Sequence, residues 1–284
     1  ADHDRLALMH FSYGAVLDDA IRPVQRGFDR ASMAAHVRGY IFEGSTASSE
    51  GMYLARQQLN SVPATNNNRS NLRVIVFFSD GAPNSFGTYL TWNSGDGCKT
   101  AGTIATDDGG KGEPGGLYDL NQQFYVIGGG CTPQIDYYPA DLKDYASALP
   151  AFYNAHVSYD QSLDPTTKYE FPVVTNSPRV VTNAITYRNV NRAARNIVEA
   201  MARKSRDEGI YVFTLGLGSQ LKAGSGYDKE KGEDTLKCMA NATDAPSRCF
   251  DATKPIGLYC YAATTSDLTP CFSKLASAIM RISN

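Results

Sequence analysis

The chain has 284 residues, enough for one large domain or two small ones with a sizeable core. Apolar residues make up 42% and charged residues 20%, which excludes a disordered or low-complexity chain. Lys and Arg total 27 against 29 Asp and Glu, and this balance indicates neither nucleic acid nor an anionic membrane as a partner. The longest apolar stretches, such as residues 74–78, are far shorter than the roughly 18 residues of a membrane span. We therefore expect no span within this chain.

The first third predicts strands alternating with helices. In chain order these are a buried strand at 5–12, an edge strand at 18–24, helices at 31–40 and 48–59, and a strand at 73–78. Pro23 confines the second strand to an edge because proline cannot donate to a sheet ladder. The run Arg-Val-Ile-Val-Phe-Phe at 73–78 is apolar on both faces, as expected of a parallel strand covered by helices.

Residues 87–189 differ in composition from the rest of the chain and are dominated by Gly, Asn, Asp, Pro and Tyr. A helix is expected at 139–154 and none longer. The segment is too long for an ordinary loop, so we interpret it as an insertion with its own structure. Its aromatic residues form either a recognition surface or the small core of the insertion. These are Tyr137, Tyr138, Tyr145, Phe152, Tyr153, Tyr159 and Tyr169.

Sequence patterns typical of alternating strands and helices return in the last third of the chain. The expected elements are a helix at 191–205 stopped by Gly209, a strand at 210–215, a short helix near Leu236, a strand at 258–262 and a helix capped by Ser266. Strands that alternate with helices imply right-handed crossovers and a parallel sheet covered on both faces. Functional groups in such sheets lie at the carboxyl ends of strands, here after Phe11, Phe78 and Leu215. Only the second of these carries conspicuous chemistry.

Six cysteines without metal-site spacing favour disulfides and an oxidising compartment. Sequence neighbours suggest the pairs Cys98–Cys131, Cys238–Cys249 and Cys260–Cys271, out of 15 possible pairings. Six buried free thiols in a cytosolic protein are the alternative.

Two motifs carry a resemblance to a known family. Gly44-Ser45-Thr46, four residues and then Gly51 open one helix, and a later apolar strand ends in Ser79-Asp80-Gly81. In this order they resemble the von Willebrand factor type A (vWA) domain. The resemblance implies an α/β fold with a doubly wound, mostly parallel sheet. The domain would comprise residues 1–86 and 190–284, with the irregular insertion 87–189 after the fourth family strand.

The resemblance also implies a metal-ion-dependent adhesion site (MIDAS) at the top of the sheet. Thr46 would correspond to its coordinating threonine and Asp80 to the aspartate that follows the fourth strand. The cofactor would be Mg²⁺, or Ca²⁺ or Mn²⁺, because such ions prefer hard oxygen ligands. A coordination position left open would accept a carboxylate from a protein partner.

The chain departs from the family at its beginning. The family's first strand ends in Asp-x-Ser-x-Ser, the loop that supplies the primary ligands, and no such loop precedes Arg5. The closest textual match, Asp160-Gln-Ser162-Leu-Asp164, lies inside the insertion. The missing strand would lie between 5–12 and 73–78 in the sheet, and unpaired backbone groups there would be costly. We therefore expect a preceding or partner segment to supply the first strand, or another strand to replace it.

No catalytic motif stands out. The four histidines form no H-E-x-x-H pattern and no Gly-x-Ser-x-Gly elbow is present, so we expect no enzyme. His10, in the middle of a strand, is expected to be a satisfied core or interface residue. A hydrolase would be favoured only by a perturbed carboxylate pair or a Ser–His contact in the insertion.

These observations predict an extracytoplasmic adhesion or protein-binding module that is secreted, periplasmic or on a bacterial cell surface. The Ser-Asp-Gly-Ala-Pro-Asn-Ser segment, the insertion and the cysteine-rich C-terminal part look similar to vWA proteins of tight-adherence pilus systems. The alternative is a structural or assembly component of a pilus or envelope complex with a vestigial metal site.

Overall fold

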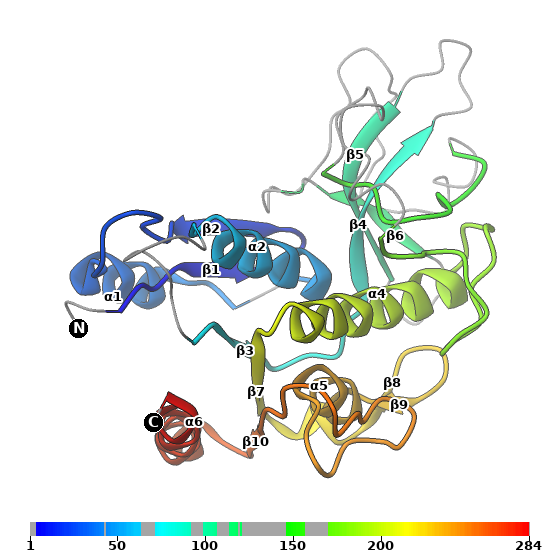
Figure 1. Ribbon diagram of the computed structural model, residues 1–284. Helices are drawn as coiled ribbons and strands as arrows, with labels where there is room; N and C mark the ends of the chain where they lie inside the picture. The colour runs from blue at the N-terminus through cyan, green and yellow to red at the C-terminus, as the bar shows by residue number, and fades with distance from the viewer. Residues whose placement is uncertain are drawn as a thin grey trace.

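A computed structural model gives the fold of the chain (Figure 1). It describes residues 4–42, 44–63, 72–91, 99–106, 114–118, 120, 146–156 and 170–283. The class is mixed α/β, with five α-helices and a three-stranded parallel sheet within these residues.

The parallel sheet has the order β10-β7-β3. Its strands are β3 (Val74–Ser79), β7 (Tyr211–Leu217) and β10 (Tyr259–Ala262). The pairs Val74↔Tyr211 and Tyr259↔Thr214 set the parallel register. All three strands were predicted, because continuous apolar runs are typical of parallel strands buried on both faces.

The first predicted strand lies beside this sheet but is not hydrogen-bonded to it. β1 (Leu8–Phe11) pairs antiparallel with β2 (Ala15–Asp19) in a separate hairpin. The chain reverses at a tight turn in which the Ser12 amide donates to the Gly14 carbonyl at 2.8 Å. The edge strand predicted at 18–24 was therefore wrong in its bounds: the strand starts earlier, and Pro23 lies beyond its end. The larger doubly wound sheet stays a prediction.

The helices lie on two faces of the sheet. α2 (Ser48–Asn60), α4 (Tyr187–Asp207) and α5 (Gly232–Ala240) pack with Ile75 and Phe77 in the larger hydrophobic core. On the opposite face, α6 (Leu268–Ser283) packs against Phe213 and Leu215. α1 (Arg30–Gly39) packs against the β1–β2 hairpin.

Helix boundaries follow local capping. Gly209, with φ +74°, directly follows the cap of α4, as predicted for a glycine after a helix. The predicted Ser266 cap of the last helix was wrong. A capping box formed by Thr264 and Asp267 instead starts the short helix η4 (Thr265–Asp267), which leads directly into α6.

The insertion forms an antiparallel sheet of β4 (Ser85–Thr91), β5 (Lys99–Thr106) and β6 (Pro114–Tyr118). Its buried side chains, Phe86, Leu90 and Ile104 among them, share the core that contains α2 and α4. This core is continuous from the insertion into the rest of the chain.

The helix predicted at 139–154 is not formed by its described part, 146–154. There the backbone bonds across to 171–183: the Leu149 amide donates to Asn183, and the Tyr153 amide to Phe171. Tyr153 is buried in the shared core, whereas five other aromatics of the insertion lie outside the described residues: Tyr137, Tyr138, Tyr145, Tyr159 and Tyr169.

Two of the three predicted disulfides are present. Cys238–Cys249 and Cys260–Cys271 have Cα separations of 5.4 and 5.6 Å. Cys98 and Cys131 lie outside the described residues, so their pairing stays a prediction. Two disulfides fit an oxidising, extracellular location.

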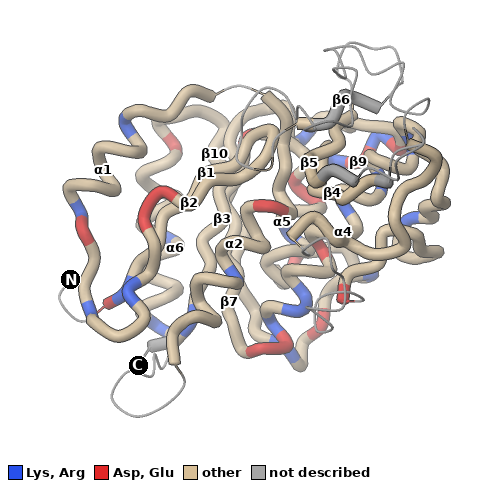
Figure 2. The backbone as a smooth tube through the Cα atoms, turned by 90° about the horizontal axis from the view of Figure 1, so that it is seen from above, with Lys and Arg blue, Asp and Glu red and all other residues tan. Residues whose placement is uncertain are grey.

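Charges of both signs are interspersed along the backbone, as the near-neutral balance leads one to expect (Figure 2). Within the described part of the chain, no helix combines the length and the apolar character required to cross a membrane.

Candidate functional site

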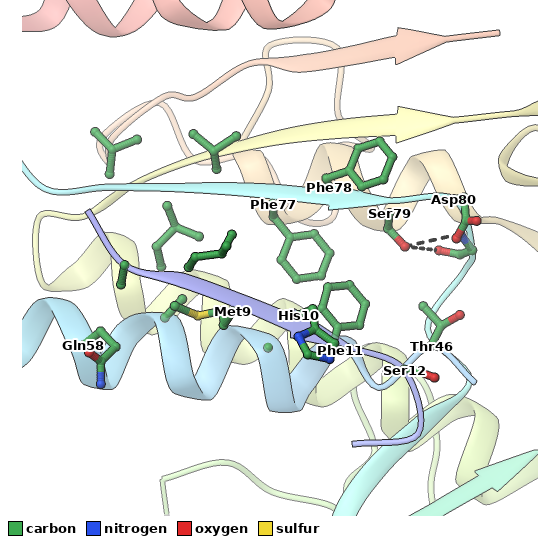
Figure 3. A pocket seen from close by; sticks show the side chains of 18 of the residues that line it. Met9, His10, Phe11, Ser12, Thr46, Gln58, Phe77, Phe78, Ser79 and Asp80 are labelled. Atoms are coloured by element: carbon green, nitrogen blue, oxygen red, sulfur yellow. Dashed lines mark hydrogen bonds between the residues drawn. The ribbon is translucent and has the colours of Figure 1, made fainter. Parts of the chain in front are cut away.

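The loop before α2 meets the turn after β3. The Thr46 amide donates to Asn84 Oδ1 at 2.7 Å, and the Asn84 amide donates to the Thr46 carbonyl at 3.3 Å. A Cβ placed on Gly81 would lie 2.5 Å from Thr46 Oγ1. The two residues singled out from the sequence, Thr46 and Asp80, are therefore brought to one corner of the molecule (Figure 3).

The end of β1 reaches the same corner. The Ala47 amide donates to the Ser12 carbonyl at 3.0 Å, which fixes the Thr46 loop to the strand end. Gly44, with φ +96°, is so close to the Ser12 hydroxyl that a side chain would collide with it. Sequence reasoning selected the strand end after Phe11 but assigned no role to Ser12. A serine directly after a buried strand was the available signal.

Ser79 shapes the turn that carries Asp80. Its hydroxyl donates to the Gly81 carbonyl at 2.9 Å and lies 3.3 Å from the Gly81 amide, from which it accepts. Ser79 is buried, whereas Asp80 is exposed. The Ser79 hydroxyl thus stabilises the turn, and the Asp80 carboxylate remains exposed to solvent.

The corner offers hard oxygen donors: the Asp80 carboxylate and the hydroxyls of Ser12 and Thr46. Mg²⁺ is commonly held by one or two carboxylates and retains several waters, so these donor types fit a hydrated divalent cation. Among the described residues, no three His, Cys, Asp or Glu side chains gather as ligands. Asp80 is the charged member of this corner, and metal binding stays a prediction.

A cleft of about 2050 Å³ begins at this corner. Residues 4–12 line one wall and residues 72–82 the other, so it follows β1 and β3 along their whole length (Figure 3). β1 and β3 make no ladder with each other. The sequence predicted a gap at this place, where the family's first strand would lie.

A second polar cluster joins α2 to the insertion. Glu50 is fully buried; its Oε1 accepts from the Gly87 amide and the Tyr153 hydroxyl, each at 2.8 Å. His156 Nε2 lies 2.6 Å from the other carboxylate oxygen, and the Tyr53 ring stacks on His156 at 4.2 Å. Burial and the Glu50 charge raise the pKa of Tyr153 well above its usual value.

Sequence reasoning missed this cluster because its partners are 37 to 106 positions apart. A perturbed carboxylate pair or a Ser–His contact in the insertion would favour a hydrolase, whereas His156 contacts the carboxylate of Glu50 on α2. The buried glutamate anchors the insertion.

His10 is satisfied as predicted. Its Nδ1 lies 2.8 Å from Asp18 Oδ2, and its ring contacts Tyr40 at 4.6 Å. Burial and the hydrogen bond to Asp18 raise the pKa of Tyr40.

Comparison with known proteins gives similar solved structures but no family. No family model matches the chain, and no curated protein matches it. Two crystal structures of the pilus adhesin SpaC from Lactobacillus rhamnosus GG, one of them in an open conformation, align over 97% of this chain with 12% identity and a TM-score of 0.43. The chain spans 25% of the length of that adhesin. A similarity this low establishes neither a shared family nor a shared activity.

Proposed function

We propose that the chain is an extracytoplasmic, bacterial adhesion or protein-binding module of the vWA type rather than an enzyme. Its corner of Ser12, Thr46 and Asp80 would help to hold a divalent cation, Mg²⁺ or else Ca²⁺ or Mn²⁺. The observation that carries the proposal is the meeting of the Thr46 loop with the Asp80 turn.

The strand arrangement supports the vWA assignment. The hairpin and the sheet lie in the spatial order β2-β1, cleft, β3-β7-β10. In the family's order 3-2-1-4-5-6, the cleft takes the place of the first strand. In this order the Thr46 loop precedes α2, as the family's threonine loop precedes a helix. Asp80 directly follows β3, which takes the place of the family's fourth strand.

The chemistry of the corner supports reversible recognition. A cation held by few protein ligands keeps water in its remaining positions, and a partner's carboxylate can replace one of these waters. The residues of this chain would position the ion: Thr46 is held by its bonds to Asn84, and Asp80 by the Ser79 turn. Disulfides suit such a module outside the cytoplasm.

The test is a titration of the polypeptide, with any residues that its gene encodes before Ala1, with Mn²⁺ followed by water-proton relaxation. We expect a saturable site, and a drop in relaxation when acetate displaces a bound water. Thr46→Ala and Asp80→Ala should weaken Mn²⁺ binding by at least about tenfold. Thr243→Ala and Asp244→Ala, at exposed positions after α5, should not. Absent Mn²⁺ binding in the folded wild-type protein, or unchanged Mn²⁺ binding in the folded Asp80 variant, would contradict the proposal.

The second candidate is a structural or assembly component of a pilus or envelope complex. The observation in its favour is that no three His, Cys, Asp or Glu side chains of the described residues gather where they could hold a metal ion. A folded protein that binds no Mn²⁺ would favour this candidate, with the insertion as the contacting surface.

A further inference from the structure

We propose that the start of α4 and a short hairpin beside it form a recognition surface for an acidic segment of a partner protein, with Arg188 as the residue that binds a partner's carboxylate. The inference rests on the proposed function only in taking the partner to be a protein. It does not require a bound cation.

The surface is built on the hairpin of β8 (Gly224–Ser225) and β9 (Glu230–Lys231), which lies beside the first half of α4 (Figure 1). Tyr227 lies in the turn between the two strands and is 47% exposed. The guanidinium groups of Arg188 and Arg192, one helical turn apart on α4, each lie 5.3 Å from the centre of the Tyr227 ring. Both distances are those of a cation–π contact. The ring therefore gathers two arginine side chains around one exposed position.

The two arginines contact the same ring but differ in their other partners. Arg192 Nε and Nη2 donate to the two carboxylate oxygens of Asp228 at 2.7 and 2.5 Å, and its Nη1 donates to the Val180 carbonyl at 3.1 Å. Arg188 is exposed, and among the described residues it has no hydrogen bond or ion pair. A guanidinium fork matches the geometry of a carboxylate. A carboxylate from a partner can therefore bind Arg188 as Asp228 binds Arg192.

The position of Arg188 within α4 is unfavourable unless an anion binds there. Arg188 lies in the first turn of the helix, and this turn contains no acidic residue. The positive end of the helix dipole repels a cation at this place and attracts an anion. A carboxylate bound to Arg188 would be attracted by the guanidinium and by the helix end together. Departures from such local rules are expected at functional sites.

The hairpin is held in place without a hydrogen bond from Arg188. Buried Arg195 donates to the Glu230 carboxylate at 3.0 Å. The Tyr227 amide donates to Asn191 Oδ1 at 3.1 Å. The surface is therefore pre-organised, which lowers the entropic cost of binding a partner. For the same reason, a substitution of Arg188 should leave the fold intact.

The surface borders the corner of the proposed cation site. Asn191 and Gly226 line the same cleft as Asp80. At the end of the hairpin, a Cβ placed on Gly232 would lie 3.1 Å from the Cβ of Ala82, in the turn after β3. A protein segment bound at the corner would therefore meet this surface as well.

The residue types favour a protein partner over a sulfated or phosphorylated polymer. Arginine and tyrosine are among the residues that most often dominate the binding energy of protein interfaces. Asp228 and Glu230 lie among the basic residues of the surface. Their charges would repel a continuous row of sulfates or phosphates, whereas an acidic peptide can present a single carboxylate to Arg188.

The experiment measures the binding of a fluorescein-labelled glutamate decapeptide to the full chain by fluorescence anisotropy, in EDTA and at low salt. A glutamine decapeptide is the reference, and it should bind at least about tenfold more weakly. Arg188→Gln should weaken binding of the glutamate peptide by at least about fivefold. Arg203→Gln is the matched control and should not, because Arg203 lies at the other end of α4, is exposed and also has no ion pair among the described residues.

Further variants test the ring and the internal carboxylate. Tyr227→Ala should also weaken binding of the glutamate peptide, whereas Tyr227→Phe, which keeps the ring, should not. Asp228→Asn frees Arg192 and should tighten binding by at least about threefold. Asp207→Asn removes an exposed carboxylate at the end of α4 and should leave binding unchanged.

Three results would overturn the proposal: equal or absent binding of the two decapeptides, equal effects of Arg188→Gln and Arg203→Gln, or tighter binding of a heparin oligosaccharide of the same charge than of the glutamate peptide. The measurement is made in EDTA, so its failure would not affect the outcome of the Mn²⁺ titration. A failed Mn²⁺ titration would likewise leave this surface standing, so the two proposals can fail separately.

Discussion

The hydroxyl oxygen of Thr46 lies 2.5 Å from the point at which a side chain on Gly81 would begin. Only glycine fits there without moving the threonine, so the turn after β3 and the loop before α2 are in effect one site. This contact explains in physical terms why a glycine follows Asp80.

Gly81→Ala tests that contact. The added methyl should displace the Thr46 hydroxyl and weaken Mn²⁺ binding by at least about tenfold, at a cost of about 1–3 kcal/mol in the free energy of unfolding. Mn²⁺ titration and urea unfolding measure the two effects. Gly39→Ala is the control, because nothing lies within 4 Å of its Cβ position. Wild-type Mn²⁺ affinity in Gly81→Ala would remove Thr46 from the ligand set.

Glu50→Gln addresses the anchor of the insertion. The amide cannot replace the charged acceptor that faces His156, the Tyr153 hydroxyl and the Gly87 amide. Because the site is fully buried, we expect a loss of about 3 kcal/mol in the free energy of unfolding, measured by urea denaturation.

The control for Glu50→Gln is Asp207→Asn, which breaks the exposed ion pair with Lys254. Such an exposed pair is screened by solvent and contributes little to stability. A loss no larger in Glu50→Gln than in Asp207→Asn would show that the buried cluster adds little to stability.

The sequence predicted those parts of the fold that depend on local patterns. The apolar run of β3, the helix that opens at Ser48 and the spacing of Cys238 and Cys249 are local signals, and each was confirmed. The pairing of β1 was not foreseen, because an apolar strand next to a tight turn fits an antiparallel hairpin as well as a parallel sheet.

The candidate site was predicted in part. Thr46 and Asp80 were found because each lies beside a recognisable element, Thr46 before a helix and Asp80 after a strand, whereas Ser12 joins them only through tertiary contacts. The cap at Thr264 could have been identified, since Thr264 and Asp267 have capping-box spacing. The Glu50 cluster could not, because long sequence separations leave no periodic signal.

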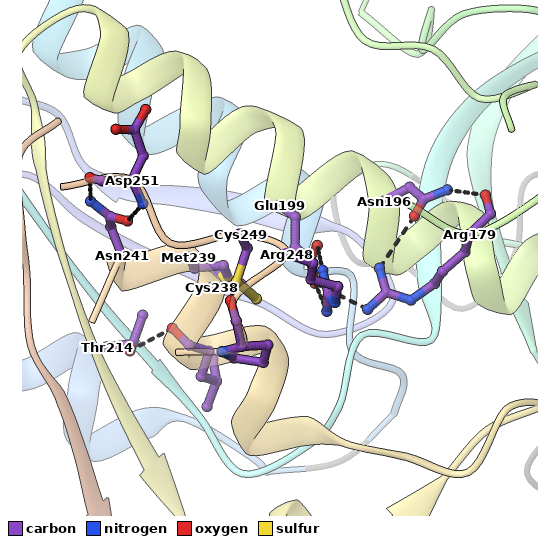
Figure 4. Close-up of a disulfide and its surroundings, with 12 residues drawn as sticks. Arg179, Asn196, Glu199, Thr214, Cys238, Met239, Asn241, Arg248, Cys249 and Asp251 are labelled. Carbon is purple, nitrogen blue, oxygen red and sulfur yellow. Dashed lines mark hydrogen bonds and ion pairs between the residues drawn. A yellow bond between two sulfur atoms is a disulfide. The ribbon is translucent and has the colours of Figure 1, made fainter. Parts of the chain in front are cut away.

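Removal of the Cys238–Cys249 disulfide should weaken contacts of the folded state as well as raise the conformational entropy of the unfolded chain. Arg248, next to Cys249, donates to Glu199 on α4 at 2.6 and 2.9 Å (Figure 4). Replacing both Cys238 and Cys249 by Ala frees the segment that carries this arginine. We expect a loss of about 2–4 kcal/mol in the free energy of unfolding, measured by denaturant titration.

The matched variant replaces Cys260 and Cys271, whose sequence separation is also 11. It should cost less, because the first variant also loosens the Arg248–Glu199 pair. Equal losses would assign the whole effect to the cross-links.

Peptide mapping under non-reducing conditions should also recover Cys98 joined to Cys131.

Acid should unfold the protein in part through Glu230. Burial alone would raise the pKa of Glu230, but hydrogen bonds from Arg179 at 2.6 Å and from Arg195 at 3.0 Å hold it below its usual 4.5. A carboxyl whose pKa is lower in the folded state stabilises it above the unfolded pKa, and this contribution is lost as the pH falls through the folded pKa. Stability should therefore be constant near neutrality and decline below about pH 4.5.

Glu230→Gln separates this contribution from general acid unfolding. At pH 7 it should cost about 2 kcal/mol, since it removes the charged partner from Arg195 and one of the two charged partners, Glu230 and Glu199, from Arg179, and the glutamate is only partly exposed. Between pH 5 and pH 3 the variant should lose less stability than the wild type, because the group that titrates is gone. Urea unfolding at these pH values measures both effects, with Asp244→Asn, 65% exposed at its side chain, as the control. A variant whose stability declines with acid as steeply as the wild type's would show that Glu230 does not set the acid limit.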